Sequence, residues 1–387
     1  MRAVHDLAEL DDAFARCTSE ATAAFGRGDL YVERLIRRAR HIEVQIIGDG
    51  TEVAHVWERD CTLQRRNQKL LEVAPAPSLD PAVRKQLHEA ACTLTRAVGY
   101  RGLCTVEFLL DEERGDFVFM EANPRIQVEH TVTEAVTGLD LAVTQIQLAA
   151  GKTLAELGFT QAEIPAARGF AVQLRINLES MAADGSTRPA GGTLSAYQPP
   201  SGPGIRVDGY GYAGYTTSPR YDSLLAKLIV HAGGDYPNTL RRAYRGLCEF
   251  RLEGVASNLH LLQNLLLHPQ VQSNEVSTAF IEAEAASLTA PHASAHPHRF
   301  FQSSTQTDAP AGTEPLNAPV QGVLVSLDVQ VGDSVAVGQQ VAIMEAMKME
   351  FVVKATQSGI VRALAANASD SLFEGSALLY LEPAEVA

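Results

Sequence analysis

Two glutamates and an asparagine in the first third of the chain have the side-chain types of a metal site. Glu107 lies in the apolar run 105–110, and Glu121 and Asn123 lie two residues apart in the run 117–123. If the two runs are neighbouring strands, two carboxylates and one amide oxygen converge on one sheet surface. Oxygen ligands of this kind suit Mg²⁺ or Mn²⁺ that bridges nucleotide phosphates. A structural salt bridge is an equal alternative for Glu107 taken singly.

The residues that follow Asn123 have the chemistry to handle a small oxyanion. Positions 124–130 read Pro-Arg-Ile-Gln-Val-Glu-His, so one loop carries a cation, Arg125, and a carboxylate, Glu129. A guanidinium can hold an oxyanion through charge-assisted hydrogen bonds, and a carboxylate can accept its proton. The sequence therefore predicts an anion site with its own base beside the metal site.

A lysine near the C-terminal end has the setting of a carrier arm. Lys348 stands in Glu-Ala-Met-Lys-Met-Glu, residues 345–350, where an alternating strand pattern stops and then resumes. This interruption predicts a tight turn from which the lysine projects. A lysine in a loop is more often an ordinary surface residue, and Met347 and Met349 could otherwise pack in a core.

The segment around this lysine repeats itself. Residues 318–324, Ala-Pro-Val-Gln-Gly-Val-Leu, are echoed by residues 355–361, Ala-Thr-Gln-Ser-Gly-Ile-Val, and Lys348 lies between the two copies. Two similar halves indicate a small all-β domain shaped as a pseudo-symmetric flattened barrel. Strict alternation supports strands here, with one face predicted to carry Val323, Val325, Leu327, Val329 and Val331.

Composition limits the classes of function. The chain has 387 residues, is 46% hydrophobic and carries a formal net charge of −14, which fits two or three domains and disfavours nucleic acid or anionic lipid as general partners. No apolar stretch reaches the length of a membrane span, so we expect a cytoplasmic protein. The five cysteines are scattered without Cys-x-x-Cys spacing, which supports neither a zinc site nor a disulfide framework.

Two helices are well signalled in the first third. One spans 6–26, opens with Asp6 and Glu9 as a capping-box pair, and has an apolar stripe that should cover a sheet. The other runs from the cap Asp80 to Gly99. Its predicted apolar stripe consists of Val83, Leu87, Ala91, Leu94 and Val98.

Strands should position the candidate metal and anion residues. They are expected at 30–33, 42–47, 105–110 and 117–123, which makes the section α+β. Within 42–47 and its preceding residue, alternation puts Ile42, Val44 and Ile46 on one face and His41, Glu43 and Gln45 on the other.

A second lobe and a tether follow. A strand at 171–176 and helices at 236–250 and 257–267 indicate a mixed lobe that extends to about residue 282. Residues 285–314 are dominated by Ala, Ser, Thr, Pro, His and Gln, which cannot bury enough apolar surface to offset the entropy of ordering. We therefore predict a flexible tether before the β domain.

Together these motifs resemble the ATP-grasp domain of biotin carboxylases. The resemblance is carried by Glu107, the Glu121-x-Asn123 pair, the run 125–129, Glu58-Arg59-Asp60-Cys61 and Gln64-Arg65-Arg66-Asn67-Gln68-Lys69. It continues through Arg175-Ile176-Asn177 and Tyr221-Asp222-Ser223. Its implied fold is α+β, with an ATP-grasp portion and the C-terminal lobe of a biotin carboxylase.

The resemblance also implies roles for single residues. The nucleotide would be contacted by Glu33, Arg34, Ile36, His41, Gln64 and Asn67, where Arg34 and Asn67 replace the family's usual lysine and frequent histidine. The metals would be held by Glu107, Glu121 and Asn123. Bicarbonate would be bound by Lys69, Arg125, Gln127, Val128 and Glu129. Glu129 would be the base, Arg175 would stabilise the biotin enolate, and Lys69 and Arg125 complete the implied catalytic set.

The run around Lys348 resembles the biotinyl domain family, in which a biotin protein ligase joins biotin to that lysine. Related lipoyl domains usually have aspartate before the lysine and lack the flanking methionines, so biotin is favoured over lipoate. The two resemblances imply four segments: an ATP-grasp portion at 1–150, a biotin carboxylase C-terminal domain at 165–283, a linker at 284–313 and a carrier domain at 314–384.

The implied activity is a ligase reaction that uses ATP, bicarbonate and Mg²⁺ or Mn²⁺ to carboxylate biotin on Lys348. A separate carboxyltransferase and a homo-oligomer formed through the biotin carboxylase part are implied as partners. The short tether favours an acetyl- or propionyl-CoA carboxylase of fatty acid metabolism, with pyruvate, methylcrotonyl-CoA and urea as other acceptors in the family.

One departure from the family bears on activity. The resemblance starts at Met1-Arg2, which matches the end of the family's glycine-rich ATP lid, so we expect the lid and the preceding nucleotide-fold domain to be absent from this sequence. The alternative to an active ligase is therefore a catalytically silent chain that serves only as a biotin carrier and interaction module.

Overall fold

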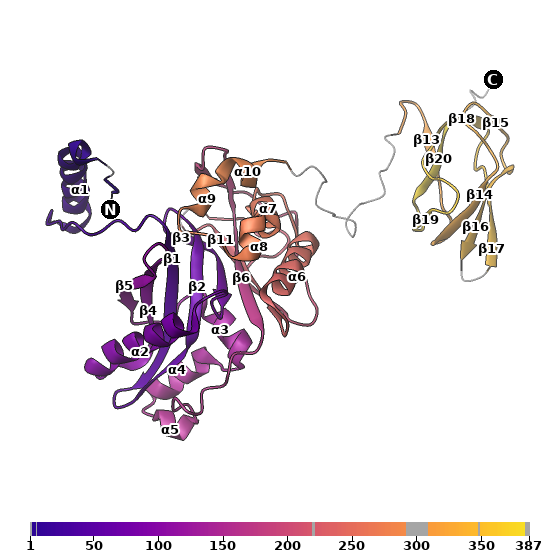
Figure 1. Cartoon of the computed structure of the whole chain (residues 1–387). Helices are drawn as coiled ribbons and strands as arrows, with labels where there is room; N and C mark the ends of the chain where they lie inside the picture. The colour runs from indigo at the N-terminus through magenta and orange to yellow at the C-terminus, as the bar shows by residue number, and fades with distance from the viewer. Residues whose placement is uncertain (1, 5, 219–220, 292–308, 347–348, 384–387) are drawn as a thin grey trace. The chain divides into compact units, whose positions relative to one another are not determined.

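The computed structural model describes residues 2–4, 6–218, 221–291, 309–346 and 349–383 (Figure 1). Contacts within the chain divide it into two compact units, Met1–His298 and Arg299–Ala387, each with its own apolar core. Within the described ranges, no helix is both long and apolar enough to cross a membrane. Met347 and Lys348 lie outside the described residues.

One eight-stranded sheet organises the first unit. Its strand order is β10-β11-β6-β3-β2-β1-β4-β5, and all neighbouring strands are antiparallel. The strands are β1 (Ala39–Asp49), β2 (Val53–Arg65), β3 (Gln68–Ala74), β4 (Arg101–Asp111), β5 (Asp116–Asn123), β6 (Phe170–Asn177), β10 (Ile205–Gly209) and β11 (Leu224–Ala232). The ATP-grasp portion and the following lobe therefore share a single sheet.

Helices pack against this sheet and bury its apolar side chains. In Figure 1, α2 (Pro81–Ala97) lies along β1 and β2, while α6 (Tyr236–Glu249) and α7 (Leu259–Leu267) lie beside β6 and β11. The other helices here are α3 (His130–Thr137), α4 (Leu141–Ala149), α5 (Leu154–Leu157) and α8 (Pro269–Ser273). Short strands complete the unit: β7 (Glu179–Met181), β8 (Thr187–Pro189), β9 (Ala196–Gln198) and β12 (Arg251–Glu253).

Strand β1 has two buried faces of opposite character. Ile42, Val44 and Ile46 are fully buried in an apolar cluster that includes Leu87 and Ala91 of α2. His41, Glu43 and Gln45 are buried as well, which confirms the predicted alternation and means that their polar groups need partners inside the protein.

The N-terminal helix is confirmed, but its predicted packing is wrong. A short 3₁₀ turn, η1 (Leu7–Glu9), leads into α1 (Leu10–Phe25), which ends at Gly26 with a φ of 73°. No described residue of α1 is buried, so the helix covers no sheet. The predicted strand at 30–33 is also wrong: the segment is irregular, because no described strand pairs with it.

Helix α2 begins as predicted and buries part of the predicted stripe: Leu87 and Ala91 lie in the apolar cluster, and Val83 packs against it. Asp80 caps it by accepting hydrogen bonds from the backbone N–H groups of Ala82 and Val83. Leu94 and Val98, expected in the core, are exposed. The reason is that the buried side of the helix is partly polar. His88 contacts Glu58 of β2 there, and Cys92 and Thr95 lie on the same buried side.

The strands that carry the metal candidates are confirmed. Strands β4 and β5 pair with Glu107 directly opposite Glu121 and Thr105 opposite Asn123. The predicted strand at 171–176 and helices at 236–250 and 257–267 correspond to β6, α6 and α7.

The start of the predicted tether is wrong. A short helix, α9 (Phe280–Ala283), is followed by α10 (Ala285–Thr289), which lies beyond residue 284. Ala285 and Leu288 are buried, and α10 packs against α7, so the first unit extends into the segment that composition assigned to the linker. Residues 292–308 of the tether lie outside the described ranges.

The second unit consists of two four-stranded sheets. One has the order β13-β20-β18-β15 and the other β17-β16-β14-β19. The strands are β13 (Glu314–Asn317), β14 (Gly322–Leu327), β15 (Ser334–Val335), β16 (Gln340–Ala346), β17 (Met349–Lys354), β18 (Gly359–Leu364), β19 (Ser371–Leu372) and β20 (Ala377–Pro383).

The sequence repeat corresponds to equivalent positions in the two sheets. Strand β14 pairs with β16 and β19, as β18 pairs with β20 and β15. A Cβ atom on Gly322 would lie 2.3 Å from the carbonyl oxygen of Glu345, and one on Gly359 would lie 2.4 Å from that of Glu382. Both glycines are thus needed for the same close strand approach, which supports the predicted pseudo-symmetry.

The apolar face predicted for residues 323–331 is only partly correct: Val329 is buried and Leu327 packs against the core, but Val323, Val325 and Val331 are exposed. Leu324 is fully buried, whereas Val323 and Val325 on either side of it are exposed. The pairing of β14 with β16 shifts between Leu324 and Ser326, a bulge that changes which side chains face the core.

Candidate active site on the first sheet

The predicted anion and metal residues converge on one face of the large sheet. Strands β1, β3, β4 and β6 contribute buried or half-buried charged side chains, and the loop from β5 to α3 adds a further carboxylate. These side chains are His41 and Glu43 from β1, Lys69 and Glu72 from β3, Glu107 from β4, Glu129 at the start of α3, and Arg175 from β6.

Glu129 is held between two cations. Its Oε1 lies 2.6 Å from Nζ of Lys69, and its Oε2 accepts a hydrogen bond of 3.1 Å from Nη2 of Arg175. The carboxylate is only 2% exposed. Since each oxygen has a different cationic partner, the orientation of the carboxylate is fixed.

Each of these two cations also forms an ion pair with a second, buried carboxylate. Lys69 donates to Oε2 of Glu43 at 2.6 Å, and Arg175 donates through Nε to Oε1 of Glu72 at 2.6 Å. Glu43 also accepts from Nε of the fully buried Arg59 at 2.5 Å. Charges therefore alternate across the sheet in the order Arg59, Glu43, Lys69, Glu129, Arg175 and Glu72.

The alternation opposes the effect of burial on ionisation at Glu43 and Lys69, whereas at Glu72 burial raises the pKa despite the neighbouring Arg175. Burial alone would raise the pKa of Glu43, but Arg59 and Lys69 outweigh it and lower that pKa to about 2. Burial likewise disfavours the ammonium of Lys69, and the neighbouring carboxylates raise its pKa above the usual range. The site thus presents fixed charges of both signs to any anion that enters it.

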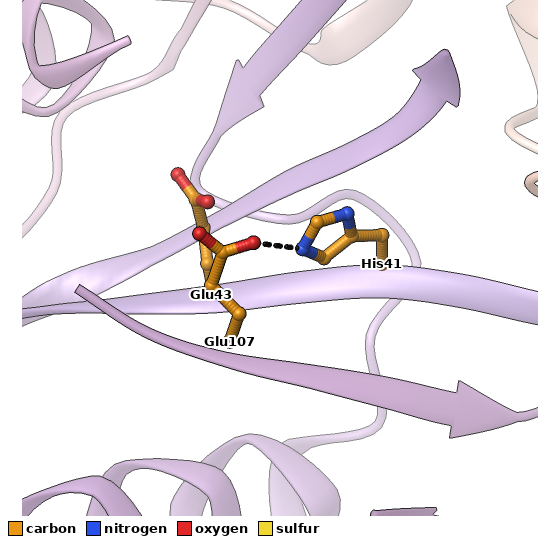
Figure 2. Close-up of side chains that lie close together, drawn as sticks. All are labelled: His41, Glu43 and Glu107. Carbon is orange, nitrogen blue, oxygen red and sulfur yellow. Dashed lines mark ion pairs between the residues drawn. The ribbon is translucent and has the colours of Figure 1, made fainter. Parts of the chain in front are cut away.

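Glu107 joins this charged row to the metal candidates. Its Oε2 lies 2.6 Å from Nε2 of His41, an ion pair drawn in Figure 2, and 3.5 Å from Nζ of Lys69. Its Oε1 accepts from Nδ2 of Asn123 at 2.7 Å and from Nε2 of Gln127 at 2.9 Å. Burial opposes ionisation of Glu107, but His41 and Lys69 outweigh it and lower its pKa to about 2.

The residues present fit a hard divalent cation on one side of Glu107. Asn123 bridges the two carboxylates, since its Nδ2 also lies 2.8 Å from Oε1 of Glu121. Two carboxylates and an amide form an oxygen-rich donor set suited to Mg²⁺ or Mn²⁺, because the amide group can turn its oxygen toward the cation.

A second cluster of possible metal ligands in the site is less suited to a metal. Ligand atoms of His41, Glu43 and Glu107 lie within 4.8 Å of one another (Figure 2). However, Lys69 already contacts both carboxylates, and its ammonium supplies the positive charge that a metal would bring. The Glu121 and Asn123 side of Glu107 is therefore the better cation position.

The structure does not join every predicted residue to this cluster. Gln64 comes close to it, with Nε2 lying 3.5 Å from Nδ1 of His41. The backbone carbonyl of Val128 accepts a hydrogen bond of 2.9 Å from Nζ of Lys227. Arg125 is exposed, and among the contacts described its side chain donates only to the carbonyl of Ile126.

The remaining nucleotide candidates lie in irregular or turn segments. Glu33 is exposed, Ile36 is half-buried, and Arg34 lies 3.6 Å from Asp111 and 3.5 Å from Asp116. Asn67 occupies the tight turn between β2 and β3 with a φ of 64°, a left-handed conformation that asparagine tolerates better than most residues. Lys348 lies outside the described residues.

Three charged residues of the site were missed as functional candidates. Glu72 and Lys227 were not singled out, and Arg59 entered only as part of a motif. The signal for Glu72 is a single charged residue inside the apolar run 70–74, whereas alternation would put it on the face opposite Lys69. Glu72 meets Arg175, 103 positions later, because of the antiparallel register of β3 and β6.

Family models account for most of the chain. Residues 1–157 match the carbamoyl-phosphate synthase L chain ATP-binding domain, residues 173–283 match the biotin carboxylase C-terminal domain, and residues 314–381 match the biotin-requiring enzyme domain. This order of domains decides the family. The chain belongs to the biotin-dependent carboxylases. Its α+β first unit and all-β second unit are those that the sequence predicted for this family.

Relatives of this carboxylase chain include pyruvate carboxylase of Aspergillus niger, 46% identical over 284 residues that make up 73% of this chain and 23% of that protein. A single-chain, multi-domain long-chain acyl-CoA carboxylase has a similar structure, with a TM-score of 0.64, 38% identity, and coverage of 97% of this chain and 38% of the other. The chain thus spans about a quarter of the length of its curated relatives.

A third relative is the biotin carboxylase domain dimer of Hydrogenobacter thermophilus 2-oxoglutarate carboxylase, solved with MgADP, ADP and bicarbonate. Its TM-score is 0.68 at 37% identity, and the match covers 74% of this chain and 61% of that chain. The predicted kinship with biotin carboxylases is therefore confirmed for this carboxylase chain.

Proposed function

We propose that this chain carboxylates biotin carried on Lys348 in a reaction that consumes ATP and bicarbonate. The observation that carries the proposal is Glu129, a buried carboxylate clamped between Lys69 and Arg175 and adjacent to the Glu107 metal candidates. A base beside fixed cations suits bicarbonate, because the cations attract the anion and the base accepts its proton.

In this proposal, bicarbonate is bound by Lys69, Arg125, Gln127, Val128 and Glu129. Glu129 takes the proton, and the resulting carbonate attacks the γ-phosphate of ATP to form carboxyphosphate and ADP. Carboxyphosphate then breaks down to CO₂ and phosphate, and the phosphate takes the proton from the ureido nitrogen of biotin. Arg175 stabilises the negative charge left on biotin, and the nitrogen attacks CO₂ to form carboxybiotin. Lys227 and Gln127 support this step by fixing the backbone and side chains of the β5–α3 loop.

The nucleotide half uses residues around Glu107. Glu107, Glu121 and Asn123 would hold Mg²⁺ or Mn²⁺, which neutralises phosphate charge when bound. Glu33, Arg34, Ile36, His41, Gln64 and Asn67 would contact the nucleotide. Support comes from the similar Hydrogenobacter domain, which was solved with MgADP and bicarbonate.

The carrier half uses the second unit. Strand β16 ends at Ala346 and β17 starts at Met349, and these two residues are register partners. Met347 and Lys348 follow Ala346 in the sequence, and we propose Lys348 as the residue to which a biotin protein ligase joins biotin. We propose domain limits at 1–150, 165–289 and 314–384, with a linker that begins after α10.

The acyl acceptor and the partners follow from the family. We propose an acyl-CoA acceptor such as acetyl- or propionyl-CoA, supported by the likeness of 97% of this chain to a long-chain acyl-CoA carboxylase. The pyruvate carboxylases among its relatives make pyruvate the competing acceptor. A carboxyltransferase would receive the carboxybiotin, and the first unit would form a dimer like the Hydrogenobacter domain.

Bicarbonate-dependent ATP cleavage with added free biotin tests the proposal. The purified chain should release phosphate only when bicarbonate and Mg²⁺ are both present, and Glu129→Gln should reduce the rate by roughly 10²-fold or more. A chain that carries biotin but releases no phosphate under these conditions would instead be a carrier and interaction module.

A further inference from the structure

We propose that Glu72 is a positioning residue for Arg175 and that it serves the biotin half of the reaction, while Glu43 serves the bicarbonate half through Lys69. This inference rests on the proposed function. It assigns a separate role to each of the two buried glutamates that pair with the cations of the site.

The surroundings of Glu72 leave its carboxylate little freedom. Glu72 is fully buried on β3, and its Oε1 accepts from Nε of Arg175 at 2.6 Å. Its Oε2 accepts from Nε2 of Gln173 at 3.1 Å, and Gln173 is its register partner on β6. Thr131 of α3 donates in turn to Oε1 of Gln173 at 2.5 Å. Both oxygens of Glu72 are thus fixed by neighbours on different elements.

This arrangement determines how Arg175 presents its guanidinium. Glu72 occupies Nε, and Glu129 occupies Nη2 at 3.1 Å, so two carboxylates on different elements fix the plane of the planar cation. Nη1 is given no hydrogen bond by the described residues. Glu72 therefore aims the arginine and prevents Glu129 from taking all of its donors.

Glu43 has the corresponding place behind Lys69, but its contacts differ. It is also fully buried, and it accepts from Lys69 at 2.6 Å and from Arg59 at 2.5 Å. Neutralising Glu43 would leave Arg59 buried without its carboxylate, which destabilises the fold itself. Glu72 pairs with one cation and one neutral amide, so its charge can be removed with less damage.

The geometry also separates the two halves of the reaction. Lys69 lies near Glu107, on the side of the metal candidates, at 3.5 Å. Arg175 binds the other carboxylate oxygen of Glu129, Oε2, and has no described contact with Glu107. A change at Glu72 should therefore disturb the transfer of CO₂ to biotin more than the formation of carboxyphosphate.

The test compares Glu72→Gln with Glu72→Asp, and uses Glu89→Gln on the exposed surface of α2 as the matched control. With Glu72→Gln, carboxybiotin formation should fall by about tenfold or more, a clearly larger fall than that of bicarbonate-dependent ATP cleavage without biotin. Glu72→Asp keeps the charge and should recover part of the loss, and Glu89→Gln should behave as wild type.

A second measurement does not depend on activity. In chain labelled with ¹⁵N-arginine, the Nε–H signal of Arg175, assigned by its loss in Arg175→Lys, should be slow to exchange with water in wild type and Glu72→Asp. It should exchange at least tenfold faster in Glu72→Gln.

Two results would overturn the inference: an unchanged Arg175 Nε–H signal in Glu72→Gln, or an equal fall of ATP cleavage and carboxybiotin formation in that variant. Absence of bicarbonate-dependent ATP cleavage in wild type is a different result. It would refute the proposed function, while the exchange rate of Arg175 would still decide whether Glu72 positions it.

Discussion

The two units of this chain prepare their chemistry in opposite ways. The first surrounds its candidate base with buried charges, among them Arg59, Glu43 and Glu72, that are paired across several strands. The second buries no charged side chain among its described residues, and its core is apolar. A catalytic site of fixed charges thus needs many distant partners, whereas a carrier lysine needs only a stable scaffold.

The largest effect should come from the carrier lysine. Lys348→Arg should abolish biotin incorporation, because the guanidinium cannot form the amide with biotin, and it should leave unfolding of the second unit unchanged. Intact-mass measurement after expression with a biotin protein ligase checks this. Lys354→Arg on β17 is the control and should still gain the mass of biotin. Biotin on the Lys348→Arg variant, or lipoate in place of biotin on the wild-type chain, would contradict this prediction.

The next effect is on stability of the first unit. Arg59 is fully buried and also donates to Gln45 at 2.8 Å and Thr133 at 3.0 Å, so Arg59→Met should lower the free energy of unfolding by about 3–5 kcal/mol. Calorimetry should show a lower melting temperature for the first unit and an unchanged one for the second. Equal stability of Arg59→Met and wild type would mean that the charge row does not support the fold.

The matched change in the second unit is Leu324→Ala. This side chain is fully buried in an apolar core, so its truncation should cost about 2–5 kcal/mol in the unfolding of the second unit alone. Val323→Ala beside it is exposed and should cost less than about 1 kcal/mol. The same loss in both variants would contradict the side-chain directions of β14.

The smallest predicted difference between the two units is in how their stability depends on pH. The pKa values of Glu43 and Glu107 are lowered to about 2 in the folded state, so their stabilisation is complete above the unfolded value of 4.5 and is lost as pH falls toward 2. His55 adds to this trend because burial, reinforced by His88, lowers its pKa to about 4, and its unfolded form takes up a proton from about 6.5 downward.

The first unit should therefore lose stability progressively as pH falls from about 6.5 toward 2, more steeply than the second unit. Denaturant unfolding at several pH values measures the two transitions. A first unit with pH-independent stability in this range would show that these carboxylates are not held ionised by their neighbours.

Local patterns were enough to predict the elements that carry the metal candidates. The alternation of β1, the pairing of β4 with β5 and the cap Asp80 of α2 each depend on residues close in sequence. The same holds for the repeat around Lys348, where Gly322 and Gly359 meet the same close approach.

Prediction from the sequence failed where the position of a side chain depends on contacts with residues far away in the sequence. The exposed position of Leu94 follows from the contact of His88 with Glu58, thirty residues earlier, and the outward direction of Val323 follows from a bulge in its pairing with β16. Glu72 was overlooked because its partner Arg175 comes from β6, and only the register of the sheet places the two together.

The most direct test of the central claim follows labelled bicarbonate to the carrier lysine. With ATP, Mg²⁺ and ¹⁴C-bicarbonate, the biotinylated chain should gain acid-labile label on the biotin of Lys348, and Glu129→Gln should gain less than about a hundredth as much in the same time. Equal labelling of Glu129→Gln and wild type, or no labelling of a fully biotinylated wild-type chain, would contradict the account.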